Sequence, residues 1–419
     1  MSDEHLRAVA DNVADFHEAK QQRALIRDSK GAVLGIEANA LTLIREQERF
    51  AGVFFDEFHQ AVCVQAGAGA QAWGDDDDIA GLEYLQRNHS SKMRIEVFAR
   101  ALRKVARERS RDALKDYLNG LPAWDGVARI DHWGVDALGC DDSEYTQAAG
   151  ANMLKALVAR GLEPGADVHE CYILEGQQGI GKTRALRALA GRFYVEITAP
   201  IGSNDFMREL RGAWLADLAE LSQIKRGSVE VVKQILSRNE DRFVEKFERE
   251  ARAYLRRCVF AGSTNEGTYL ADTTGNRRFI PLRCGQVRPD LIEANRDQYF
   301  AEALHRVAAG ERWFDLPAPA AAQVEHERDA RRIRDPWEEI FEAYLAGRSE
   351  TWAGDLFANC LHTLARERTA TDEQRIGRVL RSLGWNRQGN RQRREGVLVY
   401  VWRPPSPPGG GTGGTGGTA

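Results

Sequence analysis

The sequence predicts an α/β protein built on a parallel sheet, with a small, mostly helical N-terminal domain and a further C-terminal domain. Apolar runs of strand length alternate with helical patterns between residues 130 and 330, and such alternation favours parallel strands joined by helices. One of these strands runs directly into a complete G-x-x-x-x-G-K-[ST] loop, a motif that cradles phosphate. We expect domains at 1–125, 126–320 and 335–403, followed by a disordered tail of Pro, Gly and Thr at 404–419.

The bulk composition excludes several classes of protein. The 419 residues are 43% hydrophobic and 29% charged, with a net charge of −4, so any nucleic-acid surface must be local. The six cysteines form no C-x-x-C pair and the histidines form no ligand ladder, which favours reduced thiols and a cytoplasmic protein. The polar N-terminus and the lack of an 18-residue apolar run predict no signal peptide and no membrane partner.

The phosphate-binding loop is the strongest functional signal. Its glycines let backbone N–H groups face a polyphosphate at a helix N-terminus, which favours negative charge. Lys182 would reach the β- and γ-phosphates of ATP, and the hydroxyl of Thr183 would bind Mg²⁺. The alternative is an ordinary Gly-rich turn before a helix. The residues expected to bind nucleotide are Gly176, Gln177, Gln178, Gly179, Ile180, Gly181, Lys182 and Thr183.

Two carboxylates and one amide follow other apolar runs. Asp217 ends the run 213–217 and Glu220 lies three residues on, so one helical turn would place both on the same side. We assign Asp217 to the Mg²⁺ shell and Glu220 to polarising the attacking water, two roles that spacing leaves exchangeable. Asn265 ends a later strand and would contact the γ-phosphate or that water. The alternatives are a capping aspartate, a surface glutamate and a turn asparagine.

Two adjacent arginines, Arg277 and Arg278, precede another apolar strand. Planar guanidinium groups recognise phosphate well, and such an arginine can act in trans on the nucleotide of a neighbouring subunit. The alternative is a pair of surface arginines that flank a strand. The first interpretation predicts a homo-oligomer with catalytic sites between its subunits.

A first basic cluster, at 238–257, is a candidate DNA contact. It includes Arg242 and Lys246 but is interleaved with glutamates. Such a stretch could instead be a self-paired helix or hairpin.

A second basic cluster contains Arg391, Arg393 and Arg394, in a turn between a helix at 372–384 and a strand at 397–402. Helix, basic turn and strand is the order of a winged helix, whose wing can lie along phosphates. The alternative is a small bundle with a solvated loop.

Several ordered motifs between about residues 110 and 290 carry a family resemblance. They are Trp124-Asp-Gly-Val-Ala-Arg129, the loop motif at 174–183, Gly212-Ala-Trp-Leu-Ala-Asp-Leu-Ala-Glu-Leu221, and Phe260-Ala-Gly-Ser-Thr-Asn265 with the following 269–279. In this order they resemble the virulence-associated protein E family. That family is similar to the superfamily 3 helicases of phages and small viruses, a branch of the AAA+ ATPases.

The resemblance implies an AAA+-type core and an ATP-driven DNA motor, either a helicase or a replication initiator of a phage or mobile element. It implies assembly as a hexamer on single-stranded or forked DNA. Many relatives carry an N-terminal primase domain, for which the first 110 residues are too short, so a separate primase or replication protein is an expected partner. The alternative function is a nucleotide-switched oligomeric regulator or defence protein that does not unwind DNA.

Overall fold

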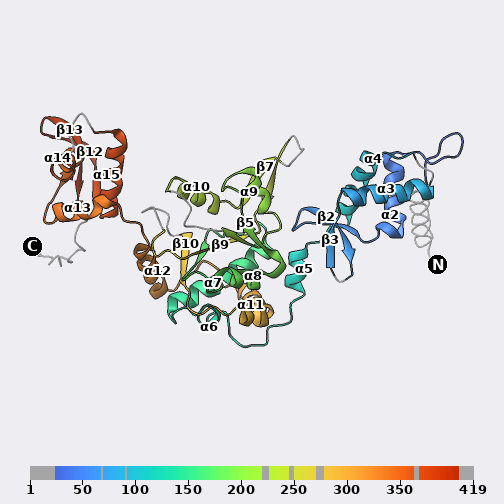
Figure 1. Ribbon diagram of the computed structural model, residues 1–419, viewed down its shortest axis with the longest axis horizontal. Coiled ribbons are helices and arrows are strands. Elements are labelled where there is room, and N and C mark those ends of the chain that lie inside the picture. The colour runs from blue at the N-terminus through green and yellow to red at the C-terminus, as the bar shows by residue number, and fades with distance from the viewer. Residues whose placement is uncertain are drawn as a thin grey trace, which may run out of the picture.

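The computed structural model describes residues 24–67, 69–89, 92–218, 226–244, 250–269, 278–362 and 368–404, without the side chains of 226–230. The described residues form three bodies in a row: a small one with the N-terminal elements, a central one with the large sheet, and a small one with the C-terminal elements (Figure 1). The tail expected to be disordered lies outside the described residues from position 405 on.

The N-terminal body combines helices with a sheet that the sequence analysis did not predict. Its helices are α2 (Glu37–Glu46), η1 (Glu48–Phe50), α3 (Asp75–His89) and α4 (Ile95–Glu108). The next helix, α5 (Ala113–Asn119), packs into the core of the central body through Leu114 and Leu118. Strands β1 (Val53–Asp56), β2 (Ala61–Ala66) and β3 (Gly69–Ala72) form an antiparallel sheet in that order. Val53 of β1 packs in one core with Phe98 and Leu102 of α4. The expectation of a mostly helical region was therefore incomplete, because its short strands carry too few residues for a clear alternation.

The central body confirms the predicted parallel sheet. Its five strands are β4 (Cys171–Glu175), β5 (Tyr194–Ile197), β6 (Leu215–Leu218), β9 (Val259–Thr264) and β10 (Phe279–Arg283). They pair in the order β10-β4-β9-β6-β5, and every pairing is parallel. The carboxyl ends of all five strands therefore share one edge of the sheet, where the segments that follow the strands gather.

Alternate side chains of β4 enter two different cores, one on each face of the sheet. Tyr172 and Leu174 join the core made by four long helices, and Cys171 and Ile173 join the other. The first face carries α6 (Trp133–Leu138), α7 (Glu144–Leu162), α8 (Lys182–Ala190), η2 (Gly191–Phe193), α11 (Pro289–Ala308) and α12 (Ala318–Ala330). The second carries α9 (Asn204–Glu209), α10 (Arg226–Leu236) and the hairpin of β7 (Glu240–Val244) and β8 (Ala251–Leu255).

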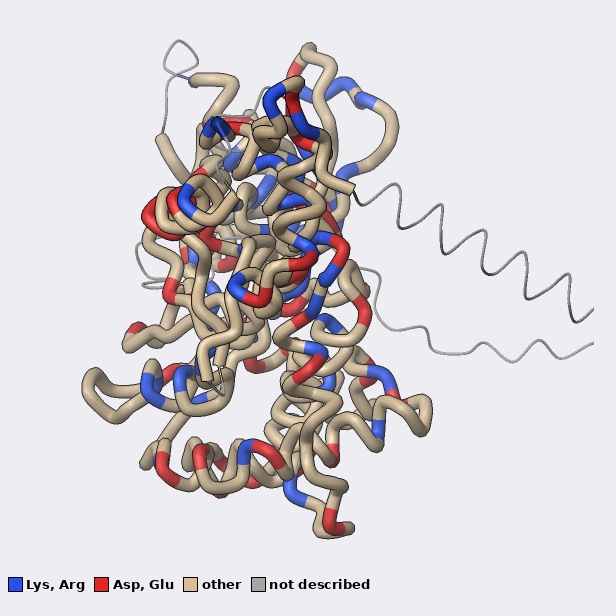
Figure 2. The backbone as a smooth tube through the Cα atoms, turned by 90° about the vertical axis from the view of Figure 1, so that its right-hand side faces the viewer, with Lys and Arg blue, Asp and Glu red and all other residues tan. Residues whose placement is uncertain are grey.

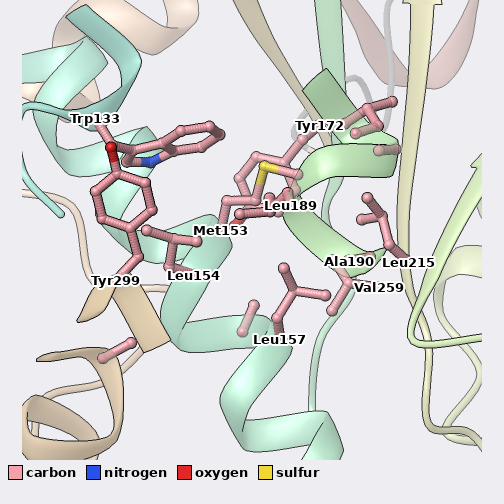
Figure 3. Packing of buried hydrophobic residues seen from close by; sticks show 14 of the residues in the cluster. Trp133, Met153, Leu154, Leu157, Tyr172, Leu189, Ala190, Leu215, Val259 and Tyr299 are labelled. Atoms are coloured by element: carbon pink, nitrogen blue, oxygen red, sulfur yellow. The ribbon is translucent and has the colours of Figure 1, made fainter. Parts of the chain in front are cut away.

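Helix α7 lies at the centre of the first core. In Figure 3, Met153 of this helix lies beside Leu189 of α8, and Leu154 lies toward Tyr299. Leu157 lies on the side of Ala190 and of Val259 of the sheet. Helix α12 also belongs to this core through Ala320 and Val324, which are buried. Residues 317–322 have the Pro- and Ala-rich composition typical of a linker, but the alanines there form a helix that packs against α7 and β10.

Trp214, which directly precedes β6, belongs to the same core. It is completely buried, its ring centroid lies 4.5 Å from that of Phe300, and its Nε1 donates a hydrogen bond of 2.7 Å to the backbone oxygen of Leu157. We predict that Trp214→Ala lowers the free energy of unfolding of the central body by about 3–5 kcal/mol, because it leaves a cavity and an unpaired carbonyl. Urea unfolding checks this, with Trp214→Phe as the control that retains most of the packing. Equal midpoints for Trp214→Ala and the wild type would contradict it.

The described residues of the C-terminal body form three helices and three strands. They are α13 (Pro336–Leu345), β11 (Thr351–Trp352), α14 (Ala353–Asn359), α15 (Ala370–Ser382), β12 (Asn386–Arg394) and β13 (Val397–Arg403). The strands form an antiparallel sheet in the order β11-β13-β12. The basic segment expected to be a turn is strand β12, and the turn itself is the two residues Glu395 and Gly396. Turn-forming Gly and Asn in this segment had hidden the strand.

Candidate nucleotide-binding site

The phosphate-binding loop connects β4 to α8 in a conformation that depends on glycine. Gly176, Gly179 and Gly181 have φ angles of 143°, 85° and 99°, values that other residues rarely adopt. A Cβ on Gly176 would come within 2.9 Å of the backbone oxygen of Cys284. Gly181 precedes α8 and makes no side-chain cap, so the first N–H groups of this helix are not satisfied by a capping side chain and can bind an anion.

Lys182 is directed back over the loop. Its Nζ donates to the backbone oxygens of Gly176 at 2.7 Å and Gln177 at 2.8 Å. Only 8% of the residue is exposed, and this burial lowers the pKa of its ammonium group. The charge is thus held at the mouth of the loop before any nucleotide binds, while Thr183 follows it, half-buried, in the first turn of α8.

A cavity of about 770 Å³ opens beside the loop, at the carboxyl edge of the sheet. Gly176, Gln177 and Ile180 of the loop line it together with Asn265, which follows β9. The structure therefore brings the predicted loop and the predicted amide to one cavity. Its volume is typical of a small-molecule site.

Asp217 lies one strand further along, on β6, which β9 separates from β4. It is 2% exposed, and its Oδ2 accepts a 2.7 Å hydrogen bond from the hydroxyl of Tyr194. Its Oδ1 is buried with no hydrogen-bond partner among the described residues. Burial raises the pKa of this carboxyl group to about 6. A buried carboxylate oxygen without a partner is the kind of ligand that a hard cation such as Mg²⁺ takes.

Magnesium fits this set of residues better than a metal that needs a protein cage. No group of three or more His, Cys, Asp or Glu side chains able to hold a metal occurs among the described residues. Mg²⁺ is commonly bound by one or two carboxylates, with nucleotide phosphates and water completing its shell. Asp217 and the hydroxyl of Thr183 could supply the protein ligands of such a shell.

The other predicted catalytic residues are placed differently. Glu220 and Arg277 lie outside the described residues. Arg278 is half-buried and directly precedes Phe279, which pairs with Cys171 at the start of β4. The loop instead follows Glu175 at the far end of the same strand, and a five-residue strand spans roughly 15 Å. Arg278 therefore sits at the edge of the sheet opposite the loop of its own subunit.

Sequence reasoning missed a buried ionic cluster at the base of the loop. Glu175, immediately before Gly176, accepts two hydrogen bonds from the guanidinium of Arg331 and one of 2.5 Å from the hydroxyl of Tyr269. Glu175 and Arg331 are each 7% exposed and line the cavity. The sequence did contain a signal for Glu175, because it is an acidic residue at the end of the strand that leads into the loop. Arg331 stands in a run of charged residues, and nothing there distinguished it from a solvated arginine.

The first basic cluster proves to be an antiparallel hairpin, β7 and β8, one of the two forms that its alternating charges allowed. Arg256, just beyond it, is 3% exposed and forms a buried bidentate ion pair with Asp241. Arg242 is exposed on β7, and Lys246 lies outside the described residues. Part of this cluster therefore stabilises the fold and is not available to DNA.

In the second basic cluster, too, one arginine is held in an ion pair and others are exposed. Arg394 donates to Glu350 at 2.6 Å, while Arg391 and Arg393 are exposed on β12. Contact of the three arginines with DNA stays a prediction, and Arg394 is held by a carboxylate of the same body.

Charges of both signs are distributed over the described chain. Lys and Arg are interspersed with Asp and Glu along the whole backbone, without a large region of one sign (Figure 2). None of the described helices is both long and apolar enough to cross a membrane.

A glycine-rich loop with the G-x-x-x-x-G-K-[ST] pattern thus lies at the carboxyl edge of a five-stranded parallel α/β sheet, the place where ligands bind in open α/β folds. The family model for virulence-associated protein E-like domains matches residues 118–333, just over half of the 419 residues. The chain belongs to this family, which confirms the resemblance found in the motifs. The matched segment contains the loop, the sheet and α12.

Comparison with solved structures gives remote similarities. The apo structure of the NrS-1 C-terminal region is 13% identical, with a TM-score of 0.46, and the match covers 83% of this chain and 95% of that chain. The X-ray structure of JCV helicase is also 13% identical, with a TM-score of 0.26, over 59% of this chain and 79% of that chain. No curated protein matches the sequence.

Proposed function

We propose that the protein is an ATP-dependent DNA motor of phage or mobile-element replication, a helicase or replication initiator, that hydrolyses ATP between the subunits of a ring. One observation carries this proposal: a phosphate-binding loop with a buried lysine opens onto a cavity that also contains Asn265. The order of the strands and the family membership support an AAA+-type core. A hexamer is the ring size that the family resemblance favours.

The residues divide the chemistry of phosphoryl transfer among them. The N–H groups at the start of α8 and the ammonium of Lys182 bind and orient the phosphates. Thr183 and Asp217 would hold Mg²⁺. When it is bound, this ion neutralises negative charge on the phosphates. Asn265 would orient the γ-phosphate or the attacking water. Glu220 is proposed to polarise that water.

The position of Arg278 supports a site shared between subunits. Because Arg278 lies at the sheet edge opposite its own loop, its side chain cannot reach the nucleotide of the same subunit. A ring brings that edge against the loop of a neighbour, where a guanidinium stabilises the charge of the transition state. Arg277 would share this role or support it.

Subunit mixing tests the shared site. Lys182→Ala removes the ammonium group of the loop but keeps the two arginines of the same subunit. The double variant Arg277→Ala/Arg278→Ala removes these arginines but keeps the loop lysine. We expect Lys182→Ala alone to lose ATP hydrolysis by at least about 10²-fold. The arginine double variant alone should lose at least about 10³-fold, the scale of an arginine finger. A mixture should regain part of the activity, because some interfaces combine an intact loop with intact arginines. If mixing restores nothing while mixed oligomers form, the site is not shared.

A strand-displacement assay separates the motor from the nucleotide-switched regulator. A motor should release a labelled strand from forked DNA with ATP but not with a non-hydrolysable analogue. ATP-dependent assembly without strand release would favour the regulator instead. Single-stranded or forked DNA is the proposed substrate in either arm, and a separate primase or replication protein is the proposed partner of the motor.

A further inference from the structure

We infer that the hairpin of β12 and β13 is a strand-separating element that grips the phosphates of forked DNA and packs its apolar end against the first base pair of the duplex. This inference rests on the proposed function and names the part of the chain that opens the duplex. Exposure, charge and strand register in the C-terminal body carry it.

The end of the hairpin exposes apolar side chains. Val397 is 62% exposed and Leu398 is 61% exposed, the two highest values among the large hydrophobic residues that the structure describes. They directly follow the turn at Glu395 and Gly396. Residues side by side on a strand point to opposite faces, so the hairpin ends in an apolar edge with one such side chain on each face.

The hairpin face that bears Leu398 carries arginines and the exposed aromatic ring of Tyr400. Arg393 pairs with Leu398 and Arg391 pairs with Tyr400, and directly opposite residues share a face. The guanidinium carbons of Arg387 and Arg391 lie 4.4 Å and 5.0 Å from the centroid of the Tyr400 ring. Arginine and tyrosine placed in this way can bind phosphate and stack on bases.

The same face is continuous with α15. Trp402, two residues beyond Tyr400 on β13, packs against Gly377, and the guanidinium carbon of Arg381 lies 5.7 Å from its ring centroid. Arg378, one turn earlier on α15, is exposed like Arg381. The helix thus extends the row of cations from the root of the hairpin, while the apolar end projects beyond it.

The composition of the hairpin selects nucleic acid as the occupant. Residues 386–403 contain five arginines and one acidic residue, Glu395, in a chain whose net charge is −4. Arg394 and Arg403 contact Glu350, which leaves the positive charge concentrated on the face of Tyr400. Such a local excess suits a polyanion.

The apolar end further selects a fork. An intact duplex presents phosphates and groove edges, and base faces become accessible only where the stack ends or is opened. Apolar side chains of proteins are known to insert at such steps and unstack bases. A surface that combines phosphate-binding arginines with an apolar edge therefore matches the junction between duplex and single strands.

The decisive variant is Val397→Ser/Leu398→Ser in the full chain. Binding to a fork with 2-aminopurine at the first base pair is measured without ATP, so the result does not depend on motor activity. We expect wild-type protein to raise the fluorescence as this base unstacks. The variant should bind the fork within about threefold of wild type but lose most of the rise, and strand displacement should fall about tenfold. Ile340→Ser, which changes an exposed apolar residue of α13 in the same body, is the control.

A second variant tests the cationic face. Arg391→Ala/Arg393→Ala should weaken fork binding at low salt by about tenfold or more and reduce the salt slope by about 2, one for each phosphate contact. Val397→Ser/Leu398→Ser should leave the salt slope unchanged. The inference would be overturned if Val397→Ser/Leu398→Ser gave the same fluorescence rise as the wild type. It would also be overturned if the main effect of this variant were that the protein no longer associates with itself. A wild-type protein that hydrolyses no ATP but still unstacks the base would refute the motor and leave the hairpin assignment intact.

Discussion

Asp217→Asn is expected to abolish ATP hydrolysis and, at the same time, to stabilise the nucleotide-free protein at pH 8. The loss of activity should be about 10²–10³-fold, the scale of removing one electrostatic contact to a transition state. It follows from the loss of the charge that would hold Mg²⁺ near the phosphates. Nucleotide binding through the loop should persist, because Lys182 and the N–H groups of α8 are unchanged.

The gain in stability follows from the pKa of Asp217. This pKa rises from an ordinary 3.8 to about 6 on folding, a difference that corresponds to roughly 3 kcal/mol. The folded protein holds this proton more tightly than the unfolded chain does. The contribution of Asp217 to stability is therefore present in full below pH 4 and is lost as the pH rises toward 6. An asparagine does not titrate, so the free energy of unfolding of the variant does not fall with pH through this group.

Urea unfolding of both proteins at pH 4 and pH 8 measures this difference. We expect the advantage of Asp217→Asn to be absent at the lower pH and to approach roughly 2–3 kcal/mol at the higher, less whatever the altered bond from Tyr194 costs. Asp76→Asn, on the exposed first turn of α3, is the control and should show no such dependence. A variant that hydrolyses ATP normally would show that Asp217 is not at the reaction centre.

Lys182→Ala is expected to reduce both ATP binding and hydrolysis, the latter by at least about 10²-fold. The ammonium group is held over the loop by the backbone oxygens of Gly176 and Gln177. An incoming phosphate would replace these carbonyls, so the charge is already near the position in which it acts. Removing it takes away the only ammonium group that the described loop supplies.

Titration with a fluorescent ATP analogue and steady-state hydrolysis measure the two effects. Lys104→Ala changes an exposed lysine of α4, whose side chain is 65% exposed, and should change neither quantity. Lys182→Ala should also fold normally, because burial already disfavours its charge. Turnover that survives in this variant would place the hydrolytic site elsewhere in the chain.

The parts of the fold that the sequence could predict are those fixed by local pattern. The glycines and the Lys–Thr pair defined the loop that joins β4 to α8. The parallel sheet followed from strands that alternate with helices. Each of these signals is read along the chain and needs no knowledge of which distant residues are in contact.

The parts that could not be predicted depend on partners distant in sequence. Glu175 and Arg331 are 156 residues apart, and Arg394 meets Glu350 across 44 residues. Whether an arginine is buried in an ion pair or free for phosphate is decided by such contacts, which charge patterns along the chain do not reveal. The same limit hid the strands at 53–72, whose pairing is tertiary.

The ion pair between Glu175 and Arg331 has a consequence for the C-terminal body. The next residue, Arg332, donates at 2.6 Å to Glu338 of α13, and Glu338 also accepts from Ser382 at the end of α15. Arg331, which is bound to Glu175 of β4, and Arg332, which is bound to Glu338 of α13, are therefore joined by a single peptide bond. Any displacement of Glu175 when nucleotide occupies the loop would be transmitted along this covalent path, with no flexible spacer to absorb it.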